Sequence, residues 1–122
     1  MARPSPIDIE RAKYANSFVV KDKQDNSLAT AAQPAKDGAR NYILQVDASY
    51  SSSAVSGLLQ VKSGTAVVAE KYIHGTGAFD FGDIGLDAEN VNEAVSAELA
   101  ASGTAGVFGA ITLMGFYASE SS

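Results

Sequence analysis

The stretch ELAASGTAGVFGAITLMGFY, residues 98–117, decides the fold because its second half carries almost no polar side chain. Between Val107 and the aromatic Tyr117, only Thr112 is polar. A strand with one face in the core and one in water alternates apolar and polar residues. Here one face holds Val107, Ile111, Leu113 and Tyr117, and the other holds Phe108, Ala110, Met114 and Phe116. The second face is therefore expected to be covered, either within one chain or by another copy.

The residues just before this strand fit two structures. In EAVSAELAAS, residues 93–102, alanine and glutamate favour helix, and Val91, Val95 and Leu99 are spaced four apart. The alternative is a strand with Val95, Ala97, Leu99 and Ala101 inward. The turn-forming SGTAG that follows favours the strand, as one arm of a hairpin, and a helix within residues 88–101 stays the alternative.

Three further segments predict strands. NYILQVDASY, residues 41–50, alternates and places Tyr42, Leu44, Val46, Ala48 and Tyr50 on one face. Residues 57–75 form a hairpin about Ser63-Gly64, and a long crossing connection, residues 74–90, contains one short strand at AFDF. Short strands separated by Gly/Ser turns predict an all-β fold, a single antiparallel β-sandwich of the jelly-roll kind.

The first forty residues differ from the rest of the chain in proline content and in the structure they predict. All three prolines lie within the first 34 residues, and Pro4 and Pro6 predict an extended arm because proline fixes φ and restrains the residue before it. One short strand is predicted around Phe18, and residues 24–40 are predicted to be a loop. The expected organisation is therefore an arm and loop over residues 1–40 and a β-sandwich domain over residues 41–122.

Composition narrows the class of protein. The 122 residues allow one domain, and with 46% apolar and 19% charged residues the chain is globular. It contains no cysteine and no visible signal peptide, which favours synthesis in a cytoplasm. Residues 1–40 carry a net charge of +2 and residues 41–122 carry −7, so the body is a poor partner for nucleic acid. The longest apolar run is too short to cross a membrane.

No constellation of residues predicts catalysis. His74 is the single histidine and precedes a glycine-rich turn, where a hydrogen-bonded structural role is expected. The segment GTGAFDFG, residues 75–82, lacks the lysine of a phosphate-binding loop. The acids of DFGDIGLDAE, residues 80–89, do not follow the calcium-loop order and are expected to be solvated. We therefore expect no enzyme, no metal and no cofactor.

Four tyrosines offer a different kind of site. Tyrosine rings can stack on sugars, but they also pack well in strands, and the chain has no tryptophan. The candidates for a sugar-stacking face are Tyr14, Tyr42, Tyr50 and Tyr72.

From Asn41 onward the chain resembles a small β-sandwich family of tailed-bacteriophage virion proteins, the head decoration or cement proteins and their relatives in fibres and spikes. The resemblance rests on the order of four pieces: NYILQVDASY, GLLQVKSGTAVV, GAFDFGDIGL and EAVSAELAASGTAGVFGAITLMGFY. The final hairpin, AV-x-AELAASGTAGV-x-G and the apolar strand after it, is the most specific part. The first forty residues lie outside the resemblance.

The resemblance implies a protein on the virion surface that holds major capsid subunits together, commonly as a trimer, with no catalytic residues. The arm would bind the capsid or a neighbouring subunit through Pro4, Ile7, Ile9, Tyr14 and Phe18. Phe108, Met114 and Phe116, on the second face of the last strand, are the candidates for an oligomer interface. The alternative is a fibre or spike module that binds a host-surface glycan.

Overall fold

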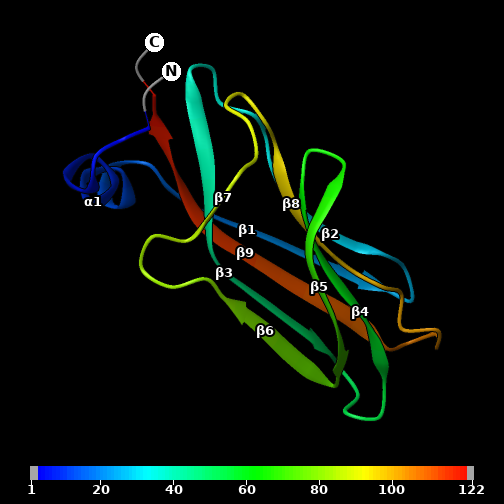
Figure 1. The fold of residues 1–122 in the computed structure, drawn as a ribbon. Coiled ribbons are helices and arrows are strands. Elements are labelled where there is room, and N and C mark those ends of the chain that lie inside the picture. Colours follow the sequence, from blue (N-terminus) through cyan, green and yellow to red (C-terminus); the bar gives the residue numbers. More distant parts are fainter. Residues whose placement is uncertain (1–2, 121–122) are drawn as a thin grey trace.

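The computed structural model describes residues 3–120, and its strands form two antiparallel sheets packed face to face (Figure 1). The predicted all-β sandwich is therefore confirmed. The elements are α1 Pro6–Ala15, β1 Ser17–Asp25, β2 Ala29–Gln33, β3 Ala39–Tyr50, β4 Ser56–Ser63, β5 Ala66–His74, β6 Thr76–Asp80, β7 Leu86–Asp87, β8 Val95–Leu99 and β9 Phe108–Ser119.

Sheet I has the strand order β1-β9-β3-β6, with the short β7 also pairing with β3, and sheet II has the order β5-β4-β8-β2. A single residue pair, His74 and Thr76, joins the two sheets where β5 turns into β6. On the opposite side the sandwich is closed by a side chain, because the Asp22 carboxylate accepts a hydrogen bond from the Thr30 backbone N–H at 2.9 Å. The apolar strand β9 is thus an interior strand of sheet I, between β1 and β3.

The core fills the space between the inner faces of the two sheets. The side chains that are fully buried there include Val46, Leu59, Val61, Leu99 and Leu113. In β8 the burial alternates, with Val95, Ala97 and Leu99 inward, so this segment is a strand and the helical alternative for residues 88–101 is wrong. The alternation outweighs the helix propensity of alanine and glutamate because each inward residue pairs with sheet neighbours on both sides.

A β-bulge changes the face on which the residues of β3 lie. The pairing of β3 with β9 shifts register between Ile43 and Gln45. Tyr42 belongs to a cluster on the outer face of sheet I, whereas Val46, four residues later, belongs to the core between the sheets. The prediction that Tyr42, Leu44 and Val46 share one face is therefore wrong, because the extra residue at the bulge reverses the alternation.

The structure shows what covers the second apolar face of β9. Ile111 and Leu113 on its inner face lie in the core. On its outer face Phe116 is fully buried and stacks on Tyr42, with ring centroids 4.8 Å apart, beneath Ala12 of α1. The far end of the second face is therefore covered within one chain, and the part before Phe116 stays partly exposed.

Residues 6–15 form a helix, so the extended arm predicted for the N-terminal segment is wrong. Ser5 is the N-cap, and it exchanges hydrogen bonds with Asp8 in a capping box. Pro6 occupies the first turn. Backbone N–H groups in the first turn have no acceptor within the helix, so the absence of an N–H in proline costs nothing there, and its fixed φ suits the helix. Proline indicates extended chain in most positions, whereas Pro6, directly after the cap residue Ser5, begins a helix.

The sandwich also begins earlier than predicted. The short strand expected around Phe18 extends over the whole of β1 and pairs with β9. The predicted loop over residues 24–40 contains β2, which pairs with β8 and buries Ala29, Ala31 and Gln33. Alanine is a weak strand former and carries little apolar surface, so the alternation of β2 does not distinguish it from a loop in the sequence. The first forty residues therefore supply β1 and the start of β3 to sheet I and β2 to sheet II.

Replacing Phe116 with alanine should destabilise the protein by about 3–5 kcal/mol, because it opens a cavity between β9 and α1. Phe108 on the same strand is 36% exposed and provides a matched control, for which Phe108→Ala should cost about 1 kcal/mol or less. Urea unfolding measures both variants. Equal losses would contradict the assignment of Phe116 to a covered face.

Stability should also depend on pH through Asp22. The hydrogen bond from the Thr30 backbone N–H, assisted by the Gln24 amide, lowers the pKa of Asp22 below its ordinary value. A carboxylate with a lowered pKa stabilises the fold above its unfolded-state pKa, near 4, and this stability is lost as the pH falls through the folded-state value. Asp22→Asn should therefore be less stable at neutral pH and lose less stability on acidification. Parallel pH curves for both proteins, measured by thermal unfolding, would contradict this.

Candidate functional site: the N-terminal helix and the groove beside it

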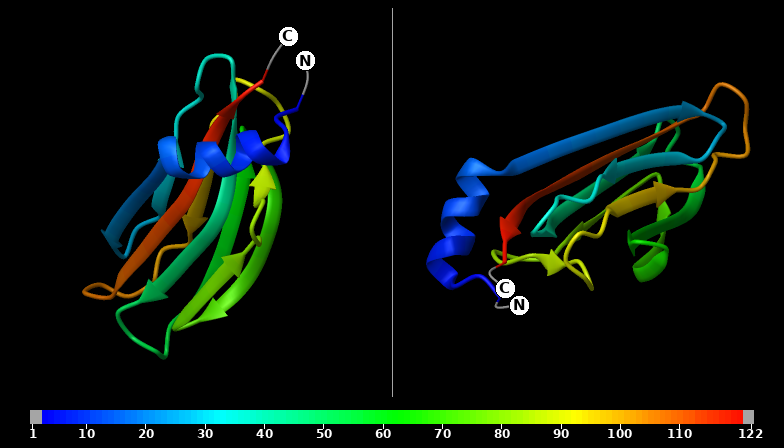
Figure 2. Two further views of the ribbon diagram at one scale, coloured as in Figure 1. Left: turned by 90° about the vertical axis from the view of Figure 1, so that its left-hand side faces the viewer. Right: turned by 90° about the horizontal axis from the view of Figure 1, so that it is seen from above.

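Helix α1 lies across the outer face of sheet I, near the end of β9 (Figure 2). Ala12 is its buried residue, and Ile9 packs beside it against the outer-face cluster. At the end of the helix the Asn16 N–H donates to the Ala12 carbonyl at 2.8 Å, and the Asn16 carbonyl accepts from the Tyr117 N–H at 3.2 Å. The helix is thus joined to β9 by backbone hydrogen bonds as well as by apolar contact.

An ion pair holds the residues before the helix. The Arg3 guanidinium donates to the Asp87 carboxylate of β7, and this contact raises the pKa of Arg3 above its ordinary value. Burial of Tyr42 nearby raises the pKa of its hydroxyl. Because β7 pairs with β3, the helix begins beside β3 and, through Asn16, ends beside β1.

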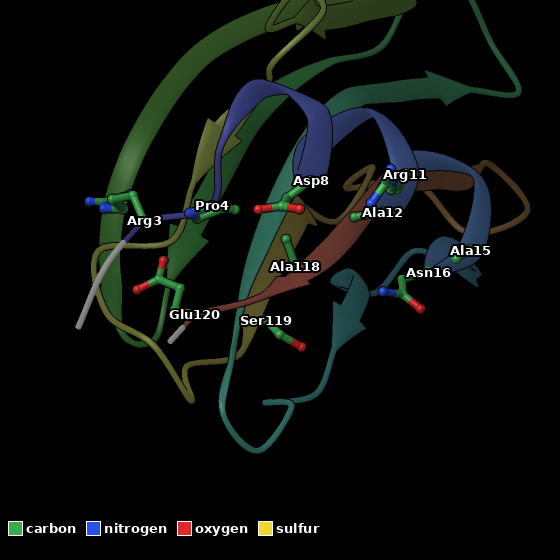
Figure 3. Close-up of a pocket in the computed structure, with 10 residues that line it drawn as sticks. All are labelled: Arg3, Pro4, Asp8, Arg11, Ala12, Ala15, Asn16, Ala118, Ser119 and Glu120. Atoms are coloured by element: carbon green, nitrogen blue, oxygen red, sulfur yellow. The ribbon is translucent and has the colours of Figure 1, made fainter. Parts of the chain in front are cut away.

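A groove of about 480 Å³ separates α1 from the end of β9 (Figure 3). Its polar lining residues are Arg3, Asp8, Arg11, Asn16, Ser119 and Glu120. Among residues 3–120, Arg11 has no carboxylate at ion-pair distance, whereas Arg3 is paired with Asp87. The groove therefore presents the Arg11 guanidinium and the Asp8 carboxylate, neither of them in an ion pair among residues 3–120, beside an amide and a hydroxyl.

One lining residue of this groove, Glu120, belongs to a buried ion pair with Arg40. The Arg40 Nε donates to the Glu120 carboxylate at 2.6 Å, and its Nη1 donates to the Ala88 carbonyl at 2.6 Å. The Glu120 side chain is 1% exposed and that of Arg40 is 10% exposed. The Glu120 backbone N–H also donates to the Gly38 carbonyl, so the end of β9 is fixed to the turn before β3 and, through Arg40, to the start of β3 itself.

The helix turns two large apolar side chains toward solvent. Ile7 is 64% exposed and Tyr14 is 87% exposed. They are seven residues apart, which places them on one side of the helix about two turns apart. We call this pair the helix stripe.

The structure separates the residues predicted for the arm into three groups. Ile7 and Tyr14 form the helix stripe, and Pro4 lines the groove. Ile9 and Phe18 are partly buried and pack inward, Ile9 under α1 and Phe18 against the main core.

The residues predicted for an oligomer interface are also separated. Phe116 has no exposed surface and therefore offers none to a neighbour. Phe108 is partly exposed and Met114 is partly buried on the open part of the outer face. The sequence did not predict Arg11, Asn16 or Glu120 as site residues, and the capping motif formed by Ser5 and Asp8 is the signal from which the helix itself could have been predicted.

The structure does not bring together the other residues considered as a metal site or a sugar-stacking face. Among residues 3–120, no group of three or more histidine, cysteine, aspartate or glutamate side chains converges as a metal site would require. His74 is hydrogen-bonded to Ser56 on the neighbouring strand. Tyr42 and Tyr50 are buried, whereas Tyr72 is exposed on β5, so the four tyrosines do not form one sugar-stacking face. In the same residues, no helix has the length and apolar character needed to span a membrane.

No protein-family model and no curated protein matches this chain. A similar solved structure is the CBM36-1 domain of a multidomain xylanase from the hindgut metagenome of Trinervitermes trinervoides, with 9% identity, a TM-score of 0.46, and 88% of this chain and 99% of that chain covered. Another is a capsid structure of Helicobacter pylori bacteriophage KHP30, with 13% identity, a TM-score of 0.42, and 83% and 87% covered. Likenesses at this level carry no argument about function.

Replacing Glu120 with glutamine should destabilise the protein by about 3 kcal/mol, because it leaves the buried Arg40 guanidinium without its counter-charge. Glu10, whose side chain is 65% exposed and 3.6 Å from the Lys13 amine, is the matched control, and Glu10→Gln should cost less than about 1 kcal/mol. Thermal and urea unfolding compare the two. A loss for Glu120→Gln as small as that of the control would show that the pair does not hold this end of the sandwich.

Proposed function

We propose that this protein is a capsid decoration or cement protein of a tailed bacteriophage, and that it grips a segment of the major capsid protein in the groove beside α1. The proposal joins the order of sequence pieces from Asn41 onward to one structural observation. That observation is the Arg11 guanidinium, which is in no ion pair among residues 3–120, in a groove built on a fixed helix.

The chemistry of the groove indicates what it would hold. A guanidinium forms two parallel hydrogen bonds with a carboxylate, so Arg11 is suited to an aspartate or glutamate of the bound segment. The Asn16 amide and the Ser119 hydroxyl also line the groove and can donate to and accept from a peptide backbone. The fitting partner is therefore an exposed acidic loop or arm of a shell subunit.

The fixed helix favours this binding. The capping box, the buried Ala12 and the Arg3–Asp87 ion pair hold α1 in place within a single chain. A site that is already formed avoids the entropy of ordering a free arm on assembly. This replaces the expected mechanism, in which an extended arm orders only on the capsid.

Location on the virion surface and a contact with the major capsid protein follow from this proposal. The trimer that the resemblance implies stays a prediction, tested by the mass in solution. A glycan-binding role also stays a prediction. The single face of four tyrosines that would have supported it is not formed, because Tyr42 and Tyr50 are buried.

The test is binding of purified protein to phage heads that lack it, measured by co-sedimentation. Arg11→Glu should weaken binding at least tenfold, because it places a carboxylate opposite the expected acidic segment. Lys71→Glu on β5, which makes the same change in net charge on sheet II, should bind as the unmodified protein does. Both variants should melt within a few degrees of it.

Two results would contradict the proposal. Failure of the unmodified protein to bind such heads would remove the decoration role. Equal binding by Arg11→Glu and Lys71→Glu would keep that role and remove the groove from it.

A further inference from the structure

Helix α1 places the Arg11 guanidinium between the two residues of the helix stripe. Successive residues of an α-helix are about 100° apart around its axis, so Arg11 lies about 40° from Ile7 and about 60° from Tyr14. Along the axis, Arg11 is about 6 Å from Ile7 and about 4.5 Å from Tyr14. Ile7 is 64% exposed and Tyr14 is 87% exposed. The helix therefore presents one row in which a cation has an exposed apolar side chain before it and another after it.

Arg11 is also the residue that joins this row to the groove (Figure 3). Ala15 lines the groove as well, and it lies about 40° from Arg11 on the side away from Ile7. Arg11 therefore lies at the rim of the groove, with the groove on one side and the helix stripe on the other. A segment whose carboxylate pairs with Arg11 lies against both.

The other charged side chains of α1 are engaged within the chain. The Glu10 carboxylate lies 3.6 Å from the Lys13 amine. The Asp8 carboxylate accepts hydrogen bonds from the backbone N–H and the hydroxyl of Ser5 in the capping box. Asp8 lies about one turn nearer the start of the helix than Arg11, so it repels a second carboxylate placed there. An acidic residue of a bound segment is therefore favoured opposite Arg11 and toward the end of the helix.

We propose that the helix stripe is part of the capsid contact, and that the shell segment held by Arg11 carries an apolar residue on each side of its acidic one. This rests on the proposed function, because the segment belongs to the major capsid protein. An extended segment fits best, since the Asn16 amide and the Ser119 hydroxyl can then bond to backbone groups that a helix would use internally. In an extended chain, residues two apart lie on one face, about 6.6–6.8 Å from each other. This spacing is close to the separation of Ile7 from Arg11, and the long Tyr14 side chain covers the difference on the other side. The predicted pattern is apolar-x-acidic-x-apolar.

The apolar and charged parts of this contact strengthen each other. An ion pair that stays exposed to water contributes little to binding. Apolar residues of the segment that cover Ile7 and Tyr14 exclude water from the carboxylate on Arg11, and the lower local dielectric strengthens the pair. They also bury apolar surface, which favours binding in itself. A charged anchor enclosed by contacts that exclude water is the arrangement found in interface hot spots. The helix stripe therefore explains how a single guanidinium can select its partner.

Co-sedimentation with phage heads that lack the protein tests the helix stripe. Ile7→Gln combined with Tyr14→Gln keeps the net charge and should weaken binding at least tenfold. Ile7→Leu combined with Tyr14→Phe keeps the apolar surface and should bind as the unmodified protein does. The matched control is Val67→Gln combined with Tyr72→Gln on β5, where the original side chains are 45% and 80% exposed. This control should also bind normally.

The results distinguish failure of the helix stripe from failure of the proposed function. If the unmodified protein does not bind the heads, both are overturned. If Arg11→Glu weakens binding and the two glutamines on α1 do not, the groove keeps its role and the helix stripe is excluded from the contact. Equal weakening by the two glutamines on α1 and the two on β5 would also overturn the role of the stripe.

Photo-cross-linking reads the sequence of the bound segment directly. The chain contains no cysteine, so a benzophenone can be attached at a single introduced one. Glu10→Cys, beside the helix stripe, should cross-link on the heads to a capsid peptide with an aspartate or glutamate and apolar residues two positions before and after it. Tyr72→Cys on β5, labelled in the same way, should not cross-link. A peptide without this pattern, or no cross-linked capsid peptide from Glu10→Cys, would overturn the proposal.

Discussion

The structure depends on covering both faces of β9. This strand lies between β1 and β3, so its backbone is paired on both sides. Its sequence places apolar residues on both faces, so neither face is suited to full exposure to water. The inner face is covered by sheet II, and the outer face near the end of the strand is covered by α1 through the stack of Phe116 on Tyr42. Burial of one aromatic ring of this size is a large term compared with the net stability of a small domain. The position of the helix, and with it the groove, follows from this requirement.

Several local features exist to make that burial possible. The bulge in β3 turns Tyr42 outward while Val46 stays in the core, so one strand supplies both clusters. Gly115 lies where β9 approaches β3, and a side chain there would collide with the Tyr42 carbonyl oxygen. The buried Arg40–Glu120 pair then fixes the end of β9 beside the helix.

Features with a regular period could be predicted from the sequence, and features made by a single residue or by distant segments could not. The strand β8 was predicted correctly because its inward residues alternate over its whole length. The face of Tyr42 was predicted wrongly because a bulge reverses the alternation without changing the composition. The helix could not be predicted from its prolines alone, because Pro6 begins a helix only when a cap residue such as Ser5 precedes it. The groove could not be predicted, since Arg11 and Glu120 are brought together only by the packing of α1 on β9.

The order of the strands in space has a consequence for how the protein is made. In sheet I, β1 and β3 do not pair with each other, and their shared partner β9 comes after both in sequence. During synthesis, β1 and β3 therefore have no partner at the edges that later pair with β9, because β9 has not yet been made. The Arg40 guanidinium likewise has no Glu120 to pair with at this stage. Exposed strand edges at this stage are the usual starting points of aggregation. Sheet I can be completed only after β9 has been synthesised, so the last step in folding this domain comes after its final strand has been made.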